Sequence, residues 1–344
     1  MSAVPAHVLA AFGWARARLT PIAIGLINET HRVEIEGDRF VLQRLHPVFA
    51  AEVNEDIDAI TTHLAARGVV TPRLVRTLDG SRHVEDAEGR PWRALTFVEG
   101  RCLTELRTTA LAHAAGAVAG RFTRATSDLE HRFSFTRSSV HDTAAHLAKL
   151  TRALRDHDPA DDSTREARVL AEEILAHAAD LPSLAGLPTR IVHGDLKVSN
   201  ILFAHDRDEA VCLVDLDTMA HGTIATEMGD ALRSWTNPKG EDDTRGAVDP
   251  GLFGAAIEGY LSETRDLLAP REIESFVDGL ETIALELSAR FCLDAFDDRY
   301  FGWDAQKYPS RRAHNAVRAR SQLSLARSAR TLRPELEQIV ARLR

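Results

Sequence analysis

The stretch Ile191–Phe203, IVHGDLKVSNILF, combines two short apolar runs with a polar loop between them. Both runs are typical of strands, because β-branched and aromatic side chains are enriched in them. The loop carries Asp195, and Asn200 follows five residues later. A short loop on rigid strands can aim both side chains at one point, and loops supported in this way host chemistry. We therefore expect the functional centre of the molecule here.

A second polar cluster follows in VCLVDLDT, residues 211–218, where an apolar run ends in Asp215 with Asp217 two residues on. Together the two segments match the H-x-D-x-x-x-x-N loop and the strand-end aspartate of phosphoryl transfer. There the loop aspartate orients the acceptor hydroxyl, while the asparagine and the strand-end aspartate hold magnesium on the phosphates. His-Gly-Asp alone could equally be a surface turn, but the whole constellation is far more specific. The pattern predicts Asp195 as catalytic, and Asn200 and Asp215 as metal ligands.

The first hundred residues predict a small sheet with one helix. The runs THRVEI and RFVLQRL join at a Gly-Asp turn, and a helical pattern covers about residues 49–66. The runs PRLVRT, RHVED and WRALTFV then complete an expected antiparallel sheet of five strands. Beyond residue 100 the composition shifts to Ala, Leu, Arg and His, which favours helices. We expect an α+β chain with a nucleotide-binding lobe at residues 1–98 and a mostly helical catalytic lobe at residues 99–344.

Composition excludes several classes of protein. The net charge of −9 argues against a dedicated nucleic-acid binder, since phosphate contacts call for a basic surface. No apolar run approaches the length that spans a bilayer, and the N-terminus lacks the pattern of a signal peptide. The three cysteines are far apart and suit a reducing compartment. We therefore expect a cytoplasmic protein with a small-molecule partner, no nucleic acid and no membrane.

The chain contains neither G-x-x-x-x-G-K-[ST] nor G-x-G-x-x-G, so no P-loop or dinucleotide fold holds the phosphates. Instead it resembles the aminoglycoside phosphotransferase and choline kinase superfamily, which has a protein-kinase-like two-lobed fold. Within it the sequence is most similar to the N-acetylhexosamine 1-kinase branch. The stretches that carry this resemblance are GLINETHRV, FVLQRLHPVF, IVHGDLKVSNILF, VDLDT, EMGDALRS and RRAHNAVRARSQ.

The resemblance implies an enzyme that uses ATP and Mg²⁺ to phosphorylate a hydroxyl, with a sugar at its anomeric position as the first choice of acceptor. Aminoglycoside, choline-like and amino-alcohol acceptors are the alternatives. A basic segment after residue 306, with ten basic and two acidic residues, argues mildly against a polycationic acceptor. A further alternative is a nucleotide-binding pseudokinase scaffold.

The resemblance also implies contacts to the nucleotide. It places a turn over the ATP phosphates at residues 25–30 and a hinge beside the adenine at residues 97–100. The implied nucleotide contacts are Gly25, Asn28, Thr30, Phe97, Val98 and Glu99.

One departure concerns a phosphate-pairing lysine that many relatives carry on the second strand. This chain reads FVLQR there, so Gln43 or Arg44 takes the position. Strand alternation cannot say which of the two faces the nucleotide. Arginine would keep the charge and offer two parallel hydrogen bonds to phosphate. Glu52 or Glu55 on the following helix could orient that arginine, or could lie on a solvated face.

Acceptor contacts are implied by the branch resemblance, and each has a structural alternative. His31 could contact the acceptor or be an ordinary strand histidine. Asp230 and Arg233, one helical turn apart, could bind sugar hydroxyls or form an internal ion pair. An aromatic ring near residue 303 could stack on a sugar or pack in a core. The full set of acceptor candidates is His31, Asp230, Arg233, Trp303, His314, Asn315 and Arg318.

Overall fold

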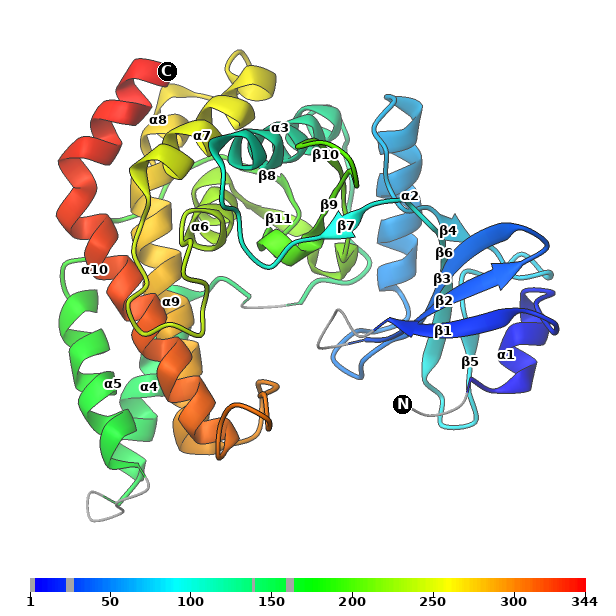
Figure 1. Ribbon diagram of the computed structural model, residues 1–344, viewed down its shortest axis with the longest axis horizontal. Coiled ribbons are helices and arrows are strands. Elements are labelled where there is room, and N and C mark those ends of the chain that lie inside the picture. Colours follow the sequence, from blue (N-terminus) through cyan, green and yellow to red (C-terminus); the bar gives the residue numbers. More distant parts are fainter. Residues whose placement is uncertain (1–3, 23–27, 138–139, 159–163) are drawn as a thin grey trace.

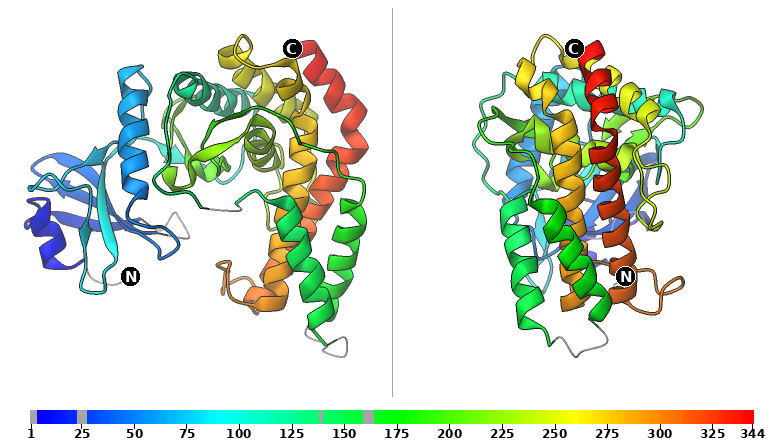
Figure 2. Two further views of the ribbon diagram at one scale, coloured as in Figure 1. Left: turned by 180° about the vertical axis from the view of Figure 1, so that it is seen from behind. Right: turned by 90° about the vertical axis from the view of Figure 1, so that its left-hand side faces the viewer.

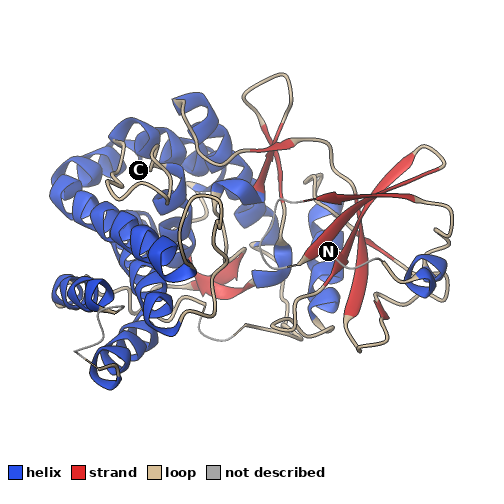
Figure 3. Cartoon of the chain, turned by 60° about the horizontal axis from the view of Figure 1, so that its bottom comes forward, coloured by secondary structure: helices blue, strands red, loops and turns tan. Residues whose placement is uncertain are grey.

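Two lobes of different composition make up the chain in the computed structural model, which describes residues 4–22, 28–137, 140–158 and 164–344. Strands gather in the N-terminal lobe, and helices dominate the C-terminal lobe (Figures 1 and 3). This confirms the kinase-like α+β class, with an antiparallel sheet in one lobe and helices in the other. The expected boundary at residues 98 and 99 falls between the last strand of the large sheet and the short strand β7 (Arg101–Cys102).

The N-lobe sheet has six strands within the described residues, where we expected five. Its order is β1-β2-β3-β6-β4, and β5 also pairs with β6. The strands are β1 (Arg18–Ile22), β2 (Glu29–Ile35), β3 (Asp38–Arg44), β4 (Leu74–Val75), β5 (Val84–Glu85) and β6 (Pro91–Thr96). The extra strand is β1, which contains Pro21. Proline lacks a backbone N–H, so it weakens a strand pattern and is tolerated at a sheet edge, which is where β1 lies.

The two faces of this sheet have different neighbours, because side chains alternate along each strand. Leu42 and Trp92 pack on one face with residues of and just after α1 (Ala6–Ala11), a cluster we call the α1 core. The residues next to them in sequence, Gln43 and Arg93, point to the opposite face. We call that side the interlobe face, because it looks toward the C-lobe (Figure 1). Helix α2 (Val53–Ala66) lies between the sheet and the C-lobe, and its apolar side joins the C-lobe core.

Helices form most of the C-lobe, as the composition beyond residue 100 predicted. They are α3 (Thr109–Thr126), α4 (Thr143–Asp156), α5 (Arg165–Ala178), α6 (Ile224–Trp235), α7 (Pro250–Thr264), α8 (Pro270–Glu274), α9 (Phe276–Asp297) and α10 (Arg311–Leu343). Helix α9 is buried along most of its length and contacts α4, α5, α6 and α10. Figure 2 shows α4, α5, α9 and α10 running side by side. They form a rigid support behind the polar loop.

Two small sheets hold that loop, and they correct one expectation. Two strand-like runs joined by a short loop suggest a hairpin, in which the two runs pair with each other. Instead β8 (Thr189–Val192) pairs with β11 (Ala220–Thr223), whereas β9 (Ile201–Phe203) pairs with β10 (Ala210–Leu213) and with β7. The loop therefore crosses from one sheet to the other, and strand–strand contacts fix both of its ends.

Glycines allow two helix pairs in the C-lobe to approach until their backbones touch. A Cβ atom at Gly116 of α3 would lie 2.0 Å from the Ala256 carbonyl oxygen of α7, and one at Gly259 would lie 2.0 Å from the His113 oxygen. The same holds where α6 meets α9, since a Cβ at Gly279 would lie 2.0 Å from the Ala225 oxygen. No other residue fits these positions without moving a helix.

We expect Gly116→Ala to destabilise the protein by about 1–3 kcal/mol, because a new methyl group would be forced into close-packed backbone. Gly254→Ala on α7 is the matched control. There the added Cβ meets only Cγ2 of Ile339, at 3.3 Å, and alanine is favoured over glycine in a helix by about 1 kcal/mol. Chemical denaturation measures both changes. Equal stabilities of the two variants would contradict the close packing of α3 on α7.

Candidate active site

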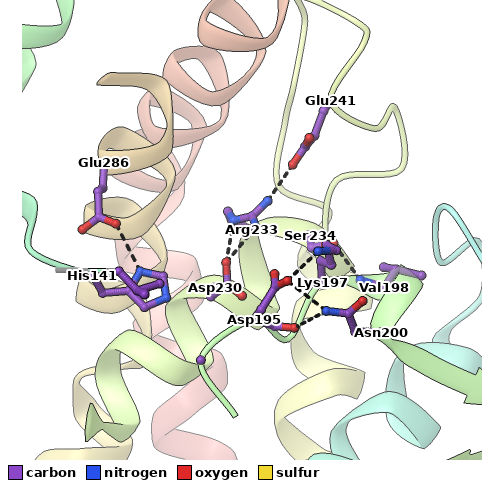
Figure 4. A network of polar contacts seen from close by, with 12 residues as sticks. His141, Asp195, Lys197, Val198, Asn200, Asp230, Arg233, Ser234, Glu241 and Glu286 are labelled. Carbon is purple, nitrogen blue, oxygen red and sulfur yellow. Dashed lines mark hydrogen bonds and ion pairs between the residues drawn. The ribbon is translucent and has the colours of Figure 1, made fainter. Parts of the chain in front are cut away.

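The loop between β8 and β9 holds Asp195 and Asn200 against each other (Figure 4). Nδ2 of Asn200 donates to the backbone oxygen of Asp195 at 2.8 Å and to its Oδ2 at 3.0 Å. Nζ of Lys197 donates to the same Oδ2 at 2.5 Å. One carboxylate oxygen of Asp195 thus has two donors, while Oδ1 has no hydrogen bond within the described part of the chain.

Burial and charge act in opposite directions on Asp195. Burial would raise the pKa of its carboxyl group, but the charge and the hydrogen bond of Lys197 outweigh burial and lower the pKa to about 2. Burial likewise opposes the charge of Lys197, and the carboxylates of Asp195 and Asp215 overcome it and raise the pKa of the lysine. Asp195 is therefore ionised at neutral pH, and its free oxygen can accept a hydrogen bond from a hydroxyl.

His193 ties this loop to the strand that ends at Asp215. Its Nε2 lies 2.9 Å from the Val214 carbonyl oxygen, which can only accept, so Nε2 carries the proton. Its Nδ1 accepts from the backbone N–H of Asp195 at 3.3 Å. Because Nδ1 can accept only when it carries no proton, this bond requires a neutral ring, and burial lowers the pKa of His193 accordingly. The backbone N–H of Val214 also donates to the backbone carbonyl oxygen of Asn200 at 2.9 Å, so the Asp195 loop and the strand before Asp215 are hydrogen-bonded to each other.

The backbone of the loop rests on a buried carboxylate of α6. Oε1 of Glu227 accepts from the N–H of His193 at 2.8 Å, and Oε2 accepts from the N–H of Gly194 at 3.0 Å. Burial raises the pKa of Glu227 to about 7, although both backbone hydrogen bonds oppose the rise. Gly194 itself has a φ of +77°, and a Cβ there would lie 2.5 Å from the Thr218 carbonyl oxygen. Only glycine suits this crossing.

Asp215 lies at the start of the turn η2 (Leu216–Thr218) and has a left-handed backbone with φ of 65°. Burial raises the pKa of its carboxyl group to about 6. The positive charge of Lys197 opposes this rise, and the negative charges of Asp217 and Asp195 add to it. Negative charge is thus crowded at this point. A non-glycine residue held in this conformation stores strain, and such strain clusters at functional positions.

The chemistry of the donor set fits a hard divalent cation. Nδ2 of Asn200 is occupied by Asp195, which leaves the amide oxygen of Asn200 free on the other side of the group. The Asp215 carboxylate is close by, because Asn200 and Val214 are hydrogen-bonded. Oxygen donors of these two types are what Mg²⁺ and Ca²⁺ prefer, and a cation would relieve the crowding that raises the pKa of Asp215.

On the interlobe face, the structure separates the two residues that could replace the phosphate-pairing lysine. Gln43 pairs across strands with Thr30 and with Arg93, so all three share that face. Nε2 of Gln43 donates to Oγ1 of Thr30 at 3.3 Å, and its Oε1 accepts from Nε of Arg93 at 3.0 Å and from Nη2 at 2.7 Å. Gln43 is therefore the residue that faces the C-lobe.

The suggestion that Arg44 carries the phosphate charge is wrong. Arg44 lies on the α1 side of the sheet, where it donates to Asp86 at 2.7 Å and to Glu88 at 2.5 Å. Its guanidinium group also lies over the Trp92 ring, 6.0 Å from the centroid. Strand alternation forces this placement once Gln43 faces the other lobe. Neither Glu52 nor Glu55 contacts Arg44.

Three other nucleotide candidates line the junction of the lobes, and Gly25 lies outside the described residues. Nδ2 of Asn28 donates to Oδ2 of Asp217 at 2.7 Å, and its Oδ1 accepts from the backbone N–H of His46 at 2.9 Å. Thr30 is buried beside it. Phe97 lies at the connection between the lobes, with the Arg39 guanidinium 5.1 Å from its ring centroid.

Residues 97–100 run from the large sheet toward β7. Glu99 forms an ion pair with Arg39, and Val98 lies half-buried between Phe97 and Glu99. A Cβ at Gly100 would lie 3.0 Å from both the Leu202 side chain and the Phe203 oxygen, so this connection touches β9 directly. The segment lies where a hinge is expected, close to the strand that follows Asn200.

Asp230 and Arg233 form a buried pair on α6 close to Asp195 (Figure 4). Nε and Nη2 of Arg233 donate to Oδ1 of Asp230 at 2.9 and 2.7 Å, and Nη1 donates to Glu241 at 2.7 Å. Oδ2 of Asp230 is buried and has no hydrogen-bond partner among the residues that the structure describes. The internal ion pair that the sequence left open is thus present, and contact with an acceptor stays a prediction.

The placement of His31 does not suit an acceptor contact. His31 shares the α1 face with Val33, and its ring stacks on Trp92 with centroids 6.2 Å apart. It is 5 % exposed, and burial lowers the pKa of the ring. The alternation that turns Thr30 toward the C-lobe turns His31 away from it, which corrects our expectation.

The candidates on α10 brace the loop before that helix. Nε2 of His314 lies 2.8 Å from Oδ1 of Asp242, and its ring stacks on Tyr308 at 3.9 Å. Nδ2 of Asn315 donates to Asp294 at 2.8 Å, and Nη1 of Arg318 donates to the Gly302 oxygen at 2.8 Å. Trp303 is half-buried in the same loop. His314 and Asn315 are buried, so these polar groups contribute to the fold of the C-lobe, and a role in acceptor binding stays a prediction.

Sequence reasoning missed four groups that shape the site, namely Lys197, Arg93, Glu227 and the pair of His141 with Glu286. Lys197 stands inside the decisive stretch and could have been found there. Nδ1 of His141 lies 3.1 Å from Oε1 of Glu286, and Thr143 donates to the other oxygen at 2.7 Å. Glu286 is 145 residues from His141, so spacing gives no signal for such a pair.

A family model for the phosphotransferase enzyme family, APH, matches residues 18–271, which include every group of the Asp195 and Asp215 loops. The chain belongs to this family. As an APH phosphotransferase it is an enzyme that transfers a phosphoryl group to a hydroxyl of a small molecule.

Solved structures share the APH phosphotransferase fold along nearly the whole chain. An aminoglycoside phosphotransferase from Alicyclobacillus acidocaldarius has a TM-score of 0.64 at 17% identity, and 98% of each chain is covered. A microcompartment-associated aminopropanol kinase has a TM-score of 0.65 at 17% identity, covering 96% of this chain and 97% of that one. An amicoumacin kinase in complex with AMP-PNP and Ca²⁺ has a TM-score of 0.60 at 16% identity, covering 91% and 89%. Identities this low show the fold and leave the acceptor open.

No helix in the described part of this APH phosphotransferase has the length and the apolar character needed to cross a membrane.

We expect Glu227 to contribute a loss of stability as pH rises from about 4.5 to about 7, and Glu227→Gln to remove this contribution. The pKa of Glu227 is raised to about 7 in the folded state from 4.5. A raised carboxyl pKa contributes stability below the unfolded value and loses it as pH passes the folded value. Glutamine cannot ionise, so the contribution of residue 227 to the pH dependence of stability disappears in the variant. The contribution of Asp215, whose pKa is also raised, remains. The measurement is unfolding free energy against pH for both proteins, and parallel curves would contradict the assignment.

Proposed function

We propose that this APH phosphotransferase transfers the γ-phosphate of ATP to a hydroxyl of a neutral polyhydroxylated acceptor, with a sugar at its anomeric hydroxyl as the first choice. The observation that carries the proposal is the state of Asp195. Its carboxylate is ionised, its Oδ2 is fixed by Lys197 and Asn200, and its Oδ1 is free. The choice of a sugar rests in addition on the resemblance to the N-acetylhexosamine 1-kinase branch.

In the proposed reaction, Oδ1 of Asp195 accepts a hydrogen bond from the acceptor hydroxyl and aligns its oxygen with the γ-phosphorus. The new P–O bond forms as the bond to the ADP oxygen breaks, and the hydroxyl proton passes to Asp195 and then to solvent. The transition state is loose, so positioning and charge neutralisation supply most of the acceleration. A carboxylate with a pKa of about 2 orients the hydroxyl early and takes the proton late.

Asn200 and Asp215 would hold a magnesium ion through the free amide oxygen and the carboxylate described above. When bound, the ion would offset the negative charge of the transferred group. Lys197 would keep Asp195 charged while the phosphate approaches. Asn28, Thr30 and Gln43 would lie on the N-lobe side of the nucleotide, and residues 97–100 would lie beside its base. These roles remain proposals that rest on the placement of the side chains.

Two buried polar atoms beside Asp195 favour an acceptor with several hydroxyl groups. Within the described residues, Oδ2 of Asp230 and Nε2 of His141 both lack a hydrogen-bond partner. Burial would lower the pKa of the His141 ring, but Glu286, and to a smaller extent Asp230, outweigh burial and raise it. Buried polar atoms are costly unless they are satisfied. Asp230 can accept from a hydroxyl and a protonated His141 can donate to one. A sugar offers both functions at adjacent carbon atoms.

The charge balance disfavours a cationic acceptor. Asp230 is paired with Arg233, and Glu286 is paired with His141, so two of the acidic groups near Asp195 have partners that can carry positive charge. An aminoglycoside or a choline-like alcohol would need unpaired carboxylates or an aromatic cage. Amino alcohols belong in the same experiment, because the fold is shared with an aminopropanol kinase.

We expect the enzyme to release ADP with hexoses or N-acetylhexosamines, and Asp195→Ala to lower kcat by about 10²–10⁴-fold, because the group that orients the hydroxyl is lost. A coupled assay of ADP release over hydroxylated metabolites, amino alcohols and aminoglycosides provides the measurement. Phosphorus NMR of the product then shows whether an anomeric phosphate forms. Binding of AMP-PNP should persist in Asp195→Ala.

Nucleotide binding without turnover on any acceptor would instead indicate a pseudokinase scaffold. Turnover restricted to amino alcohols or aminoglycosides would keep the kinase and overturn the sugar.

We expect Asp230→Asn and His141→Gln to raise the KM for the sugar about tenfold or more while the KM for ATP stays the same, because a hydrogen bond to a charged group contributes about 1.5–3 kcal/mol. His63→Gln is the matched control. His63 also binds a carboxylate, at 3.2 Å from Asp128, but lies on α2 and contacts nothing in the loop. If all three variants shift the KM alike, the acceptor site lies elsewhere.

A further inference from the structure

The interlobe face lacks the lysine that would give it a positive charge on β3, yet it is not without a cation. Arg93 lies on β6, directly across from Gln43 in the sheet register. Its side chain is 1 % exposed, and that of its partner Asp217 is 0 % exposed. The charge that is missing from β3 is therefore present one strand further along the sheet.

Arg93 connects the two lobes through a buried fork. Nη2 of Arg93 donates to Oδ2 of Asp217 at 2.8 Å, and Nη1 donates to Oδ1. The adjacent edge of the guanidinium group, which shares Nη2, donates to Oε1 of Gln43 through Nε and Nη2. Gln43 thus fixes the plane of the Arg93 guanidinium group, and the hydrogen bond to Thr30 fixes the side-chain amide of Gln43.

Asp217 is the point at which the N-lobe meets the loop of Asp215. Besides Arg93, it accepts from Nδ2 of Asn28 at 2.7 Å. It lies in the turn η2, and the next residue, Thr218, donates to the His193 oxygen at 2.9 Å. A displacement of Asp217 would therefore also shift Asp215, two residues earlier, and would shift the Asp195 loop through the hydrogen bond of Thr218.

We infer that Arg93 is a positioning residue that joins β6 to Asp217 and thereby fixes Asp215 beneath the phosphates of a nucleoside triphosphate and its divalent cation. In this arrangement Asp217 is the acidic partner of Arg93, Gln43 orients the arginine, and no lysine on β3 is needed. The inference rests on the proposed function, because it takes Asp215 as a ligand of the nucleotide-bound cation.

The geometry of the pair is what a lysine could not supply. A planar guanidinium group binds a carboxylate with two parallel hydrogen bonds along one edge and contacts Gln43 along a second edge. An ammonium group, in contrast, is a point charge on a flexible stem. Arg93→Lys therefore keeps the charge and loses the fork. Arg44→Lys is the matched control, because Arg44 is a buried, paired arginine on the opposite face of the same sheet.

The experiment measures binding of AMP-PNP by calorimetry at several Mg²⁺ concentrations, together with the melting temperature of each variant. We expect Arg93→Lys to weaken binding at saturating Mg²⁺ by about tenfold or more, and to raise the Mg²⁺ concentration needed for half-maximal binding. Arg44→Lys should alter both by less than about twofold, even where its melting temperature falls equally.

A second variant guards against simple unfolding. Arg93→Met combined with Asp217→Leu removes both buried charges, which is often tolerated by the fold. We expect this protein to remain folded and to bind Mg²⁺ and AMP-PNP poorly. Wild-type binding by the double variant, or equal losses in Arg93→Lys and Arg44→Lys, would overturn the inference alone. A wild-type protein that binds no AMP-PNP would overturn the proposed function, and the inference with it.

Discussion

Negative charge is concentrated where the two lobes meet, and the surrounding structure counteracts it. Asp195, Asp215 and Asp217 approach one another here, and Asp217 is buried while Asp195 and Asp215 are half-buried. Such charges are costly to bury unless each one is paired. Lys197 acts on Asp195 and Arg93 acts on Asp217, so the cation bound directly to each comes from a different lobe. Asp215 has no such partner within the described residues, and its pKa is raised in consequence.

The supports behind these charges are neutral or rigid. His193 bridges two backbone segments as an uncharged ring, and Glu227 holds two consecutive N–H groups of the loop. Gly194 permits the chain to cross η2 without a clash. Each of these groups contacts backbone and not the reacting atoms. They fix where Asp195 points, and positioning is the larger part of catalysis in phosphoryl transfer.

The fold and the central site were accessible from sequence, because local rules fix them. Apolar runs and turns predicted the lobes, and the spacing of Asp195, Asn200 and Asp215 predicted the loop that the structure shows. Pro21 concealed the edge strand, since one residue removed the strand signal. The neighbours of the loop could not be predicted from spacing. Arg93 meets Asp217 across 124 residues, and only the register of a folded sheet decides that Gln43, and not Arg44, faces the C-lobe.

The glycine contacts between helices also govern how the molecule can move. Where α3 touches α7 and α6 touches α9 through their backbones, neither pair can slide without a steric collision. Sliding of these helices within the C-lobe is thereby suppressed, and the covalent connection about which one lobe could rotate relative to the other is the four-residue segment 97–100. The arc of that rotation is limited by Gly100 against β9. Under the proposed function, exchange of nucleotide would depend on rotation at residues 97–100. Its rate would be set by how often the hydrogen bonds between Arg93 and Asp217 break.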